Sequence, residues 1–392
     1  MAGRAEAAGR PRGRPPWVNY LIGQGAALLG AFAVAGVVGS VIVIAYGENP
    51  LLVYETVWAF STSRPQDFAV VLENATPLIF SGLAVAVAFK AGLFNIGVEG
   101  QYIVGMAAAA AAATGFDSLA AVVLLPLTIG SSVLAATAWA AVPAVLKVKT
   151  GAHEVVTTIM MNGIAVSLVA WLLLGPLHST GGETSDLRSD IFPEAALVPN
   201  LAASFGMEDQ IPDTIAHLTW LFPVAVLTCA VVWFMLFRMR LGYEVRALGA
   251  SSGSAEAGGI SVAGTQLKVF VVSGALAGFV GLNHILGDNA YLGSNYESGL
   301  GFAGIAVAFL GRNHPVGIPL AAILIGMLLR GQDGLAIVTE LPTEILIILQ
   351  GILILAVVVA YEVVSRVLAR HSQSEEGQQE RIREEPARQA TD

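Results

Sequence analysis

Long, nearly uninterrupted apolar runs limit what this chain can fold into more than any other feature. They cover residues 21–46, 215–237 and 345–361. A helix needs roughly 20 apolar residues to cross a hydrocarbon core of about 30 Å, whereas the strands of a membrane barrel show short alternating segments. Only 12% of the residues are charged and 55% are hydrophobic, compared with about 25% charged residues in soluble domains. The sequence therefore predicts an all-α, polytopic helical membrane protein.

The N-terminal segment 1–20 is basic and leads directly into the first apolar run. This run is longer than the apolar core of about 7 to 15 residues in a signal peptide, so we expect an uncleaved first helix and a cytoplasmic N-terminus. Two later spans are short and are separated by Gly311 and Pro315, which leaves a re-entrant hairpin as an alternative there. About ten transmembrane helices are predicted, at residues 21–46, 68–89, 93–114, 118–146, 154–175, 214–237, 266–287, 299–311, 315–330 and 344–365.

The basic residues support this arrangement. Nine Lys or Arg side chains lie in the loops and tail assigned to the cytoplasm, and three lie in the outer loops, as the positive-inside rule predicts. Both termini are then cytoplasmic, and residues 21–365 form one transmembrane domain of the cell membrane. This domain has a long outer loop at 176–213 and a cytoplasmic loop at 238–265. The tail 366–392 has almost no apolar residues, so we expect it to be disordered.

The motifs of enzymes and of nucleotide-binding proteins are missing. No GxxxxGK[ST] stretch is present, so the chain has no loop of that type for ATP phosphates. His153 begins an HExxH-like stretch, but Thr157 stands where the second zinc-binding histidine would be required. The GxGxxG match at 299–304 opens an apolar span, where glycines usually serve helix packing. The single cysteine, Cys229, can form no internal disulfide. We expect no enzymatic activity, no cofactor and no bound metal.

Polar side chains within the predicted spans are the candidate functional residues. Glu99 lies in an apolar helix, four residues after Asn95 and two before Gln101. A carboxylate at the bilayer centre costs about 2.5 to 3.5 kcal/mol, so this group must face protein or water. One interpretation is that these side chains bond across helices and hold the fold. The other is that they line a polar path or gate.

Two further groups add to this pattern. Glu154, Thr158 and Asn162 recur at nearly helical spacing and form one polar stripe on an apolar helix. Asn283 and His284 stand late in another span. Several polar groups that face a common interior indicate passage of a polar, uncharged solute. The residues alone name no source of energy.

The stretches LFNIGVEGQYIVG, HEVVTTIMMN, LGYEVRALG and GFAGIAVAFLGRNHPVG resemble those of a known family. In order and spacing, across roughly residues 76–360, the chain resembles the membrane permease subunits of ATP-binding cassette (ABC) importers for nucleosides and simple sugars. The resemblance implies a cytoplasmic ATPase subunit, a second homologous permease in a heterodimer and an external solute-binding lipoprotein. ATP binding would drive the two permeases between inward-open and outward-open states.

The same resemblance assigns the inner loop 242–260 to coupling with the ATPase. The family often has a basic residue where Glu256 stands, so the electrostatics of docking differ at this position. The residues that match the family pattern are Gly242, Tyr243, Arg246, Gly249, Gly259 and Ile260.

Other functions remain open at this point. Ten helices could form the two halves of a secondary transporter or channel that works without ATP. ABC permeases for branched-chain amino acids share the fold. A membrane-embedded enzyme would need a nucleophile, metal cluster or cofactor loop that the sequence does not offer. Besides its protein partners we expect only the lipid bilayer, and no nucleic acid.

Overall fold

The computed structural model describes residues 33–179, 187–207, 209–212 and 215–339, together with a few single positions outside these ranges. The chain divides into two compact units, one made of residues 1–50 and 341–392 and the other of residues 51–340. In the first unit, the described part contains the helix Ala33–Ala45. The predicted segment 1–20, most of the last span 344–365 and the tail 366–392 lie outside the described residues.

Helices dominate the second unit, and the described residues form β-structure only as two isolated bridges. Five described helices are long and apolar enough to cross a membrane, and a sixth span results if Ala33–Ala45 and α2 (Pro50–Thr62) count together. The all-α membrane fold is as predicted, but the structure does not establish ten spans. The five helices are α3 (Pro65–Lys90), α5 (Ala121–Thr150), α6 (Glu154–Leu174), α8 (Leu221–Arg238) and α13 (Gly317–Val338).

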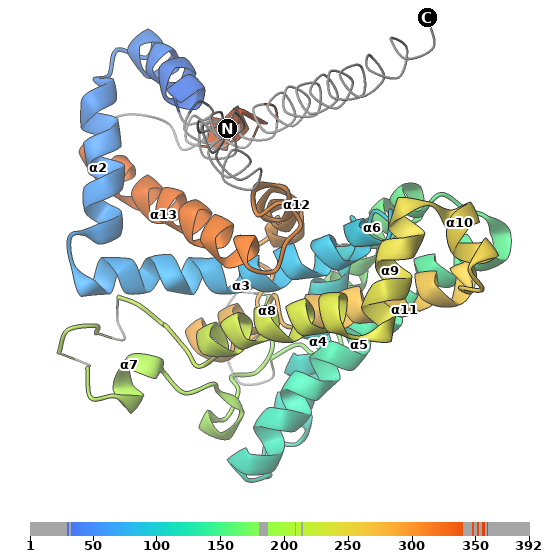
Figure 1. Ribbon diagram of the computed structural model, residues 1–392. Coiled ribbons are helices and arrows are strands. Elements are labelled where there is room, and N and C mark those ends of the chain that lie inside the picture. Colours follow the sequence, from blue (N-terminus) through green and yellow to red (C-terminus); the bar gives the residue numbers. More distant parts are fainter. Residues whose placement is uncertain are drawn as a thin grey trace, which may run out of the picture. The chain divides into compact units, whose positions relative to one another are not determined.

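Helix α3 is the core of this unit. Every residue from Ala75 to Ala88 is buried, which fits a helix that is apolar on all sides. It packs against α8, α13, α11 (Val262–Ala277) and α12 (Leu300–Leu310). Figure 1 shows α13 and α8 along different sides of α3.

Two of the differences between the predicted and the observed spans concern the C-terminal half of this unit. The span predicted at 315–330 continues to Val338, because the charge of Arg330 inside it is satisfied: its Nη2 lies 2.9 Å from Oδ1 of the buried Asp67. The span predicted at 266–287 is interrupted, since α11 ends at Ala277 and turns lead into the π-helix η2 (His284–Asp288).

The remaining elements are shorter or less apolar than these five helices. Helix α4 (Val98–Gly115) follows α3 after a non-helical stretch and packs against α5, α6 and α11. In the loop predicted to be cytoplasmic, α9 (Arg240–Ala250) and α10 (Ser252–Ala257) connect α8 to α11. In the loop predicted to lie outside, the described positions form two short helical pieces, η1 (Glu194–Ala196) and α7 (Leu201–Ser204). Bridges from Arg188 to Gly293 and from Asn200 to Thr219 tie this second loop to its neighbours.

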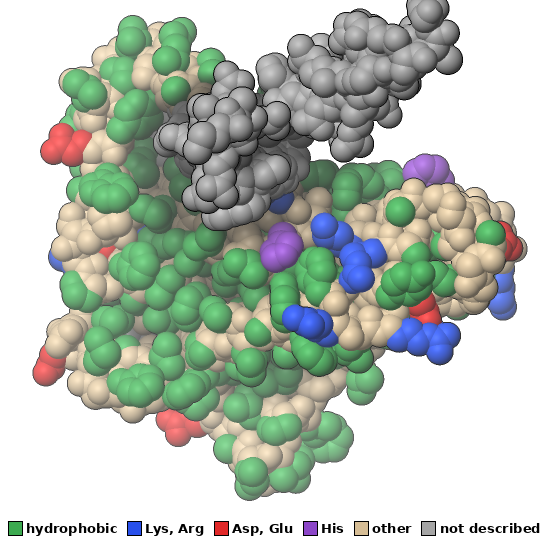
Figure 2. All heavy atoms as spheres, in the orientation of Figure 1, with side chains coloured by type: hydrophobic (Ala, Val, Ile, Leu, Met, Phe, Trp, Pro, Cys, Tyr) green, Lys and Arg blue, Asp and Glu red, His purple; other side chains and the backbone are tan. Residues whose placement is uncertain are grey.

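The surface agrees with a membrane environment. Large apolar side chains are exposed on α5, α6 and α8, and Figure 2 shows hydrophobic side chains over much of the visible face. On the same face, Lys and Arg side chains gather over the region of α9 and α11.

Candidate functional site

Helix α4 begins inside the protein, five residues later than the span predicted at 93–114. The first backbone N–H groups of a helix have no partner within the helix, so a buried start needs acceptors from elsewhere. Two asparagines supply them. Oδ1 of Asn95 accepts from the Gly97 N–H at 3.1 Å, and Oδ1 of Asn162 accepts from the Gly100 N–H at 2.9 Å.

Asn95, in the loop before α4, and Gln101, in the first turn of α4, form a closed pair. The Asn95 amide nitrogen donates to Gln101 Oε1 at 3.0 Å, and the Gln101 amide nitrogen donates to Asn95 Oδ1 at 2.9 Å. The Asn95 amide also donates to the Ser273 hydroxyl of α11, which donates to the Ala84 carbonyl of α3. All of these side chains are buried. The predicted polar residues therefore connect α4 to two neighbouring helices.

Three hydrogen bonds satisfy the buried Glu99 carboxylate of α4. Its Oε1 accepts from the Gly299 N–H at 2.7 Å and from the Tyr102 hydroxyl at 2.9 Å, and its Oε2 accepts from the Gly301 N–H at 2.8 Å. Gly299 and Gly301 stand at the start of α12, so the carboxylate caps that helix from α4 and faces the positive end of its dipole. Gly301 has no room for a side chain, since a Cβ there would lie 2.7 Å from Glu99 Cα.

The polar stripe of α6 faces α4. Thr158 is fully buried and donates to the Glu154 carbonyl, and Asn162 also donates from its amide nitrogen to the Ile96 carbonyl at 3.0 Å. Asn162 thus bonds both to the loop before α4 and to the first turn of α4.

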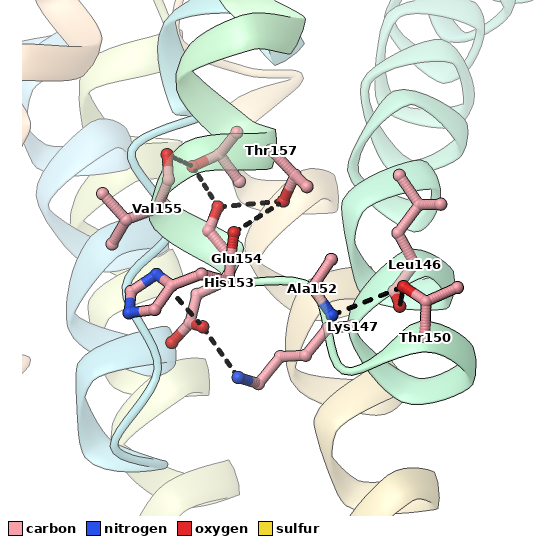
Figure 3. A network of polar contacts seen from close by, with 9 residues as sticks. Leu146, Lys147, Thr150, Ala152, His153, Glu154, Val155 and Thr157 are labelled. Atoms are coloured by element: carbon pink, nitrogen blue, oxygen red, sulfur yellow. Dashed lines mark hydrogen bonds and ion pairs between the residues drawn. The ribbon is translucent and has the colours of Figure 1, made fainter.

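Glu154 lies at the first position of α6 and pairs with a residue that the sequence analysis did not single out. Lys147, in the last turn of α5, places its Nζ 2.7 Å from Glu154 Oε2. Figure 3 shows this ion pair across the short connection between the two helices. A lysine next to a predicted loop looks like an ordinary solvated charge, so only its position seven residues before Glu154 could have drawn attention to it.

Asn283 and His284 lie apart from the Asn95 pair. Asn283 accepts from the Thr219 hydroxyl at 2.8 Å, and the His284 ring lies 3.0 Å from the amide nitrogen of Asn289, the residue that follows the π-helix. π-helical turns often occur at functional sites. Both residues line a small cavity of about 100 Å³ together with Glu73, Asn74, Asp288 and Glu297.

This cavity adjoins the Glu99 contacts. Glu297 and Leu300 line it, and the Glu297 carbonyl lies 2.9 Å from the Tyr102 hydroxyl that also contacts Glu99. Burial, with the nearby negative charges of Asp288 and Glu99, raises the pKa of Glu297. Among the residues that the structure describes, no three His, Cys, Asp or Glu side chains are grouped so as to hold a metal ion. The lining is rich in hydrogen-bond acceptors.

The predicted coupling residues lie on and beside α9. Tyr243 is exposed, whereas Gly242 and Gly249 pack against backbone: a Cβ at Gly249 would overlap the Lys90 carbonyl at the end of α3. The Arg246 guanidinium lies 5.4 Å from the ring centre of Phe237. Close packing of α9 on the ends of α3 and α8 thus fixes its position.

Glu244 is a second residue that sequence reasoning missed. It is buried on α9 between Arg240, at 2.9 Å, and Lys268 of α11, at 3.1 Å. The hydrogen bond from Lys268, with its charge and that of Arg240, lowers the pKa of Glu244. The pair between Glu244 and Lys268 ties α9 to helix α11.

A wide groove of about 710 Å³ opens beside this segment. Gly259, with a φ of +81°, turns the chain sharply between α10 and α11 at its edge. The predicted coupling residues Glu256, Gly259 and Ile260 line the groove, and the other lining residues include Lys147, Ser252 and Gln266. The last turn of α5 therefore shares this groove with the coupling segment.

Comparison with known proteins gives matches along most of the chain. A family model described as the permease component of branched-chain amino acid transport systems matches residues 68–358. A glucose ABC transporter permease protein of Haloferax volcanii is 33% identical over 344 residues, which is 87% of both chains. A guanosine ABC transporter permease protein of Bacillus subtilis is 34% identical over 83% of this chain and 90% of its own. A nucleoside ABC transporter permease protein of Lactococcus lactis is 28% identical over 82% and 87%, respectively.

Proposed function

The chain belongs to the family of permease components of branched-chain amino acid transport systems, and from this premise we propose that its solute is a nucleoside or a simple sugar. It is a permease subunit of an ABC importer and a multi-pass protein of the plasma membrane. The observation that supports this choice of solute is the similarity to the glucose and guanosine permeases over more than four fifths of this chain. Membership of this family argues against the ATP-independent transporter that the sequence alone left open.

The path of the solute is proposed to run along the buried polar residues. The lining of the small cavity offers carboxylate, amide and imidazole groups, which can bind hydroxyl groups. At about 100 Å³ the cavity is smaller than the roughly 300 Å³ of a typical ligand pocket, so it would take only part of a sugar ring in this state. A sugar ring is common to glucose and to nucleosides. Asn283 and His284 would contact the solute, and Glu99 would hold the gate helices α4 and α12 together at the edge of the cavity. Asn95, Gln101, Glu154, Thr158 and Asn162 would position these helices.

ABC permeases work together with an ATPase and a solute-binding protein, and the family therefore implies partners of these two kinds for this chain. We propose that the ATPase docks on α9 and on the groove lined by Glu256 and Ile260. The exposed ring of Tyr243 and the open groove support this location, because a docking partner needs accessible contacts. A second, homologous permease would complete the pathway as a heterodimer.

Reconstitution tests this proposal. The permease, its partner permease, the ATPase and the binding protein are placed in liposomes, and uptake of labelled guanosine, glucose and leucine is measured with and without ATP. We expect ATP-dependent uptake of guanosine or glucose, and none when the P-loop lysine of the ATPase is replaced. Uptake of leucine alone would show that the amino acid in the family's description is the solute, and uptake by the permease without the ATPase would contradict the proposed mechanism.

A further inference from the structure

The ion pair between Lys147 and Glu154 lies between the proposed docking groove of the ATPase and the polar residues of the proposed solute path. Lys147 lines the groove at which the ATPase is proposed to dock, beside Glu256. Its Nζ lies 2.7 Å from Oε2 of Glu154, and both side chains are largely shielded, with 21% and 10% of their surface exposed. One residue thus faces the proposed docking groove while holding the first residue of a membrane-spanning helix.

The local backbone explains why this contact is well placed. Helix α5 ends at Gly151, whose φ of +71° closes the helix, and α6 begins three residues later. The cation stands in the last turn of α5 and the carboxylate in the first turn of α6, so each charge also faces the favourable end of its own helix dipole. Partial burial reduces the screening of the pair by water and salt. The pair therefore holds the inner ends of α5 and α6 at a fixed separation.

From Glu154 the contacts lead inward along α6. The Glu154 carbonyl accepts from Thr158 at 2.7 Å, and a Cβ on Gly97 would lie 3.1 Å from Thr158 Cβ, which shows how closely α6 packs on the start of α4. One turn further, Asn162 bonds to Ile96 and Gly100. A shift of the first turn of α6 must therefore disturb the acceptors on which the buried start of α4 depends.

We propose that the Lys147–Glu154 pair is a positioning element that transmits ATPase engagement at the groove to the polar cluster around α4. This inference rests on the proposed function, since it needs both the docking groove and the solute path. Displacement of Lys147 by the docking ATPase would move the end of α6, and through Thr158 and Asn162 the gate formed by α4 and α12. The pair serves coupling between hydrolysis and transport and binds neither nucleotide nor solute.

The test compares ATP hydrolysis with solute uptake in the complete reconstituted complex. The variants are Lys147→Gln, Glu154→Gln and the charge-swapped double variant Lys147→Glu with Glu154→Lys. Lys149→Gln is the matched control, because Lys149 is an exposed lysine in the same turn of α5 and does not line the groove. Coupling energies between sites correspond to about 5- to 150-fold effects. The measured quantity is the ratio of ATP hydrolysed to solute transported. We expect each single variant to raise this ratio at least about fivefold. The charge swap should return it to near the wild-type value, and the control should leave it unchanged.

A purely structural role gives a different result. If hydrolysis and uptake fall in parallel in the single variants, so that their ratio stays constant, the pair only supports the fold and the proposal is wrong; an unchanged ratio with full activity refutes it as well. If the single variants do not assemble, the charge-swapped double variant provides the test. A swapped complex that assembles but does not couple hydrolysis to uptake overturns the proposal, and a swapped complex that couples them supports it. Failure of the wild-type complex to take up any sugar or nucleoside would instead count against the proposed function.

Discussion

Replacing Asn162 by leucine tests the idea that α6 satisfies the buried start of α4. The asparagine and leucine side chains have similar size, and leucine inserts into a membrane more favourably, so hydrophobicity alone predicts a neutral or stabilising change. The structure predicts the opposite, because the substitution leaves the Gly100 N–H and the Ile96 carbonyl without their partner.

The magnitude follows from these two bonds. An unsatisfied buried polar group costs about 1 to 3 kcal/mol, so the loss of two acceptor–donor contacts should lower the free energy of unfolding by about 2 to 6 kcal/mol. If the bonds behaved like the average hydrogen bond between membrane helices, at about 0.6 kcal/mol each, the loss would be only about 1.2 kcal/mol. The higher range is expected here because both partners belong to backbone that α4 cannot satisfy by itself.

Equilibrium unfolding in mixed micelles, followed by circular dichroism, measures this difference. Ser167→Leu is the control, since Ser167 is an exposed residue of α6 whose hydroxyl donates only to the Gly163 carbonyl of its own helix. This control should change stability by less than about 0.5 kcal/mol. An Asn162→Leu variant as stable as the control would refute the view that the asparagine holds the start of α4.

Three further predictions concern other contacts. Glu99→Ala should assemble with lower stability and should transport poorly, because the start of α12 loses its acceptor; full-rate uptake by an assembled variant would rule out a role in the gate. Gly249→Ala should push α9 away from the Lys90 carbonyl and reduce ATPase binding to the permease, measured by co-purification, whereas an unchanged yield of complex would contradict the packing argument. The lowered pKa of Glu244 means that its bond to Lys268 contributes stability above the ordinary carboxyl pKa and that this stability is lost as the pH falls through the lowered value. The protection of α9 amides from hydrogen exchange, relative to the intrinsic exchange rate at each pH, should therefore fall at acid pH in the wild type, and Glu244→Gln should lose this pH dependence.

The sequence predicted the membrane fold well because hydrophobic runs report directly on helices. Span bounds were predicted less well where buried groups decide them. The helix that ends at Val338 carries Arg330, a charge that normally ends a span, and only the distant Asp67 makes it acceptable there. The predicted start of α4 was too early because the loop around Asn95 is as apolar and glycine-rich as the helix that follows.

The polar side chains could be identified from the sequence, but their partners could not. Glu99 stands out in any hydropathy pattern, yet the Gly299 N–H that it binds is 200 residues away. Lys147 and Glu244 escaped notice because charges near predicted loops are usually solvated. Nothing in a single sequence tells a solvated charge from one that is buried by packing between helices.

The contact between Glu99 and α12 also constrains biogenesis. During synthesis the carboxylate emerges 200 residues before the Gly299 amide that will bind it. Until α12 is made, the Glu99 carboxyl group lacks the backbone N–H donors of Gly299 and Gly301, and a polar group without these partners is unfavourable in lipid. We therefore expect α4 to settle into its final depth late, when the C-terminal third of the chain arrives, and the nascent protein to depend on the insertion machinery until then.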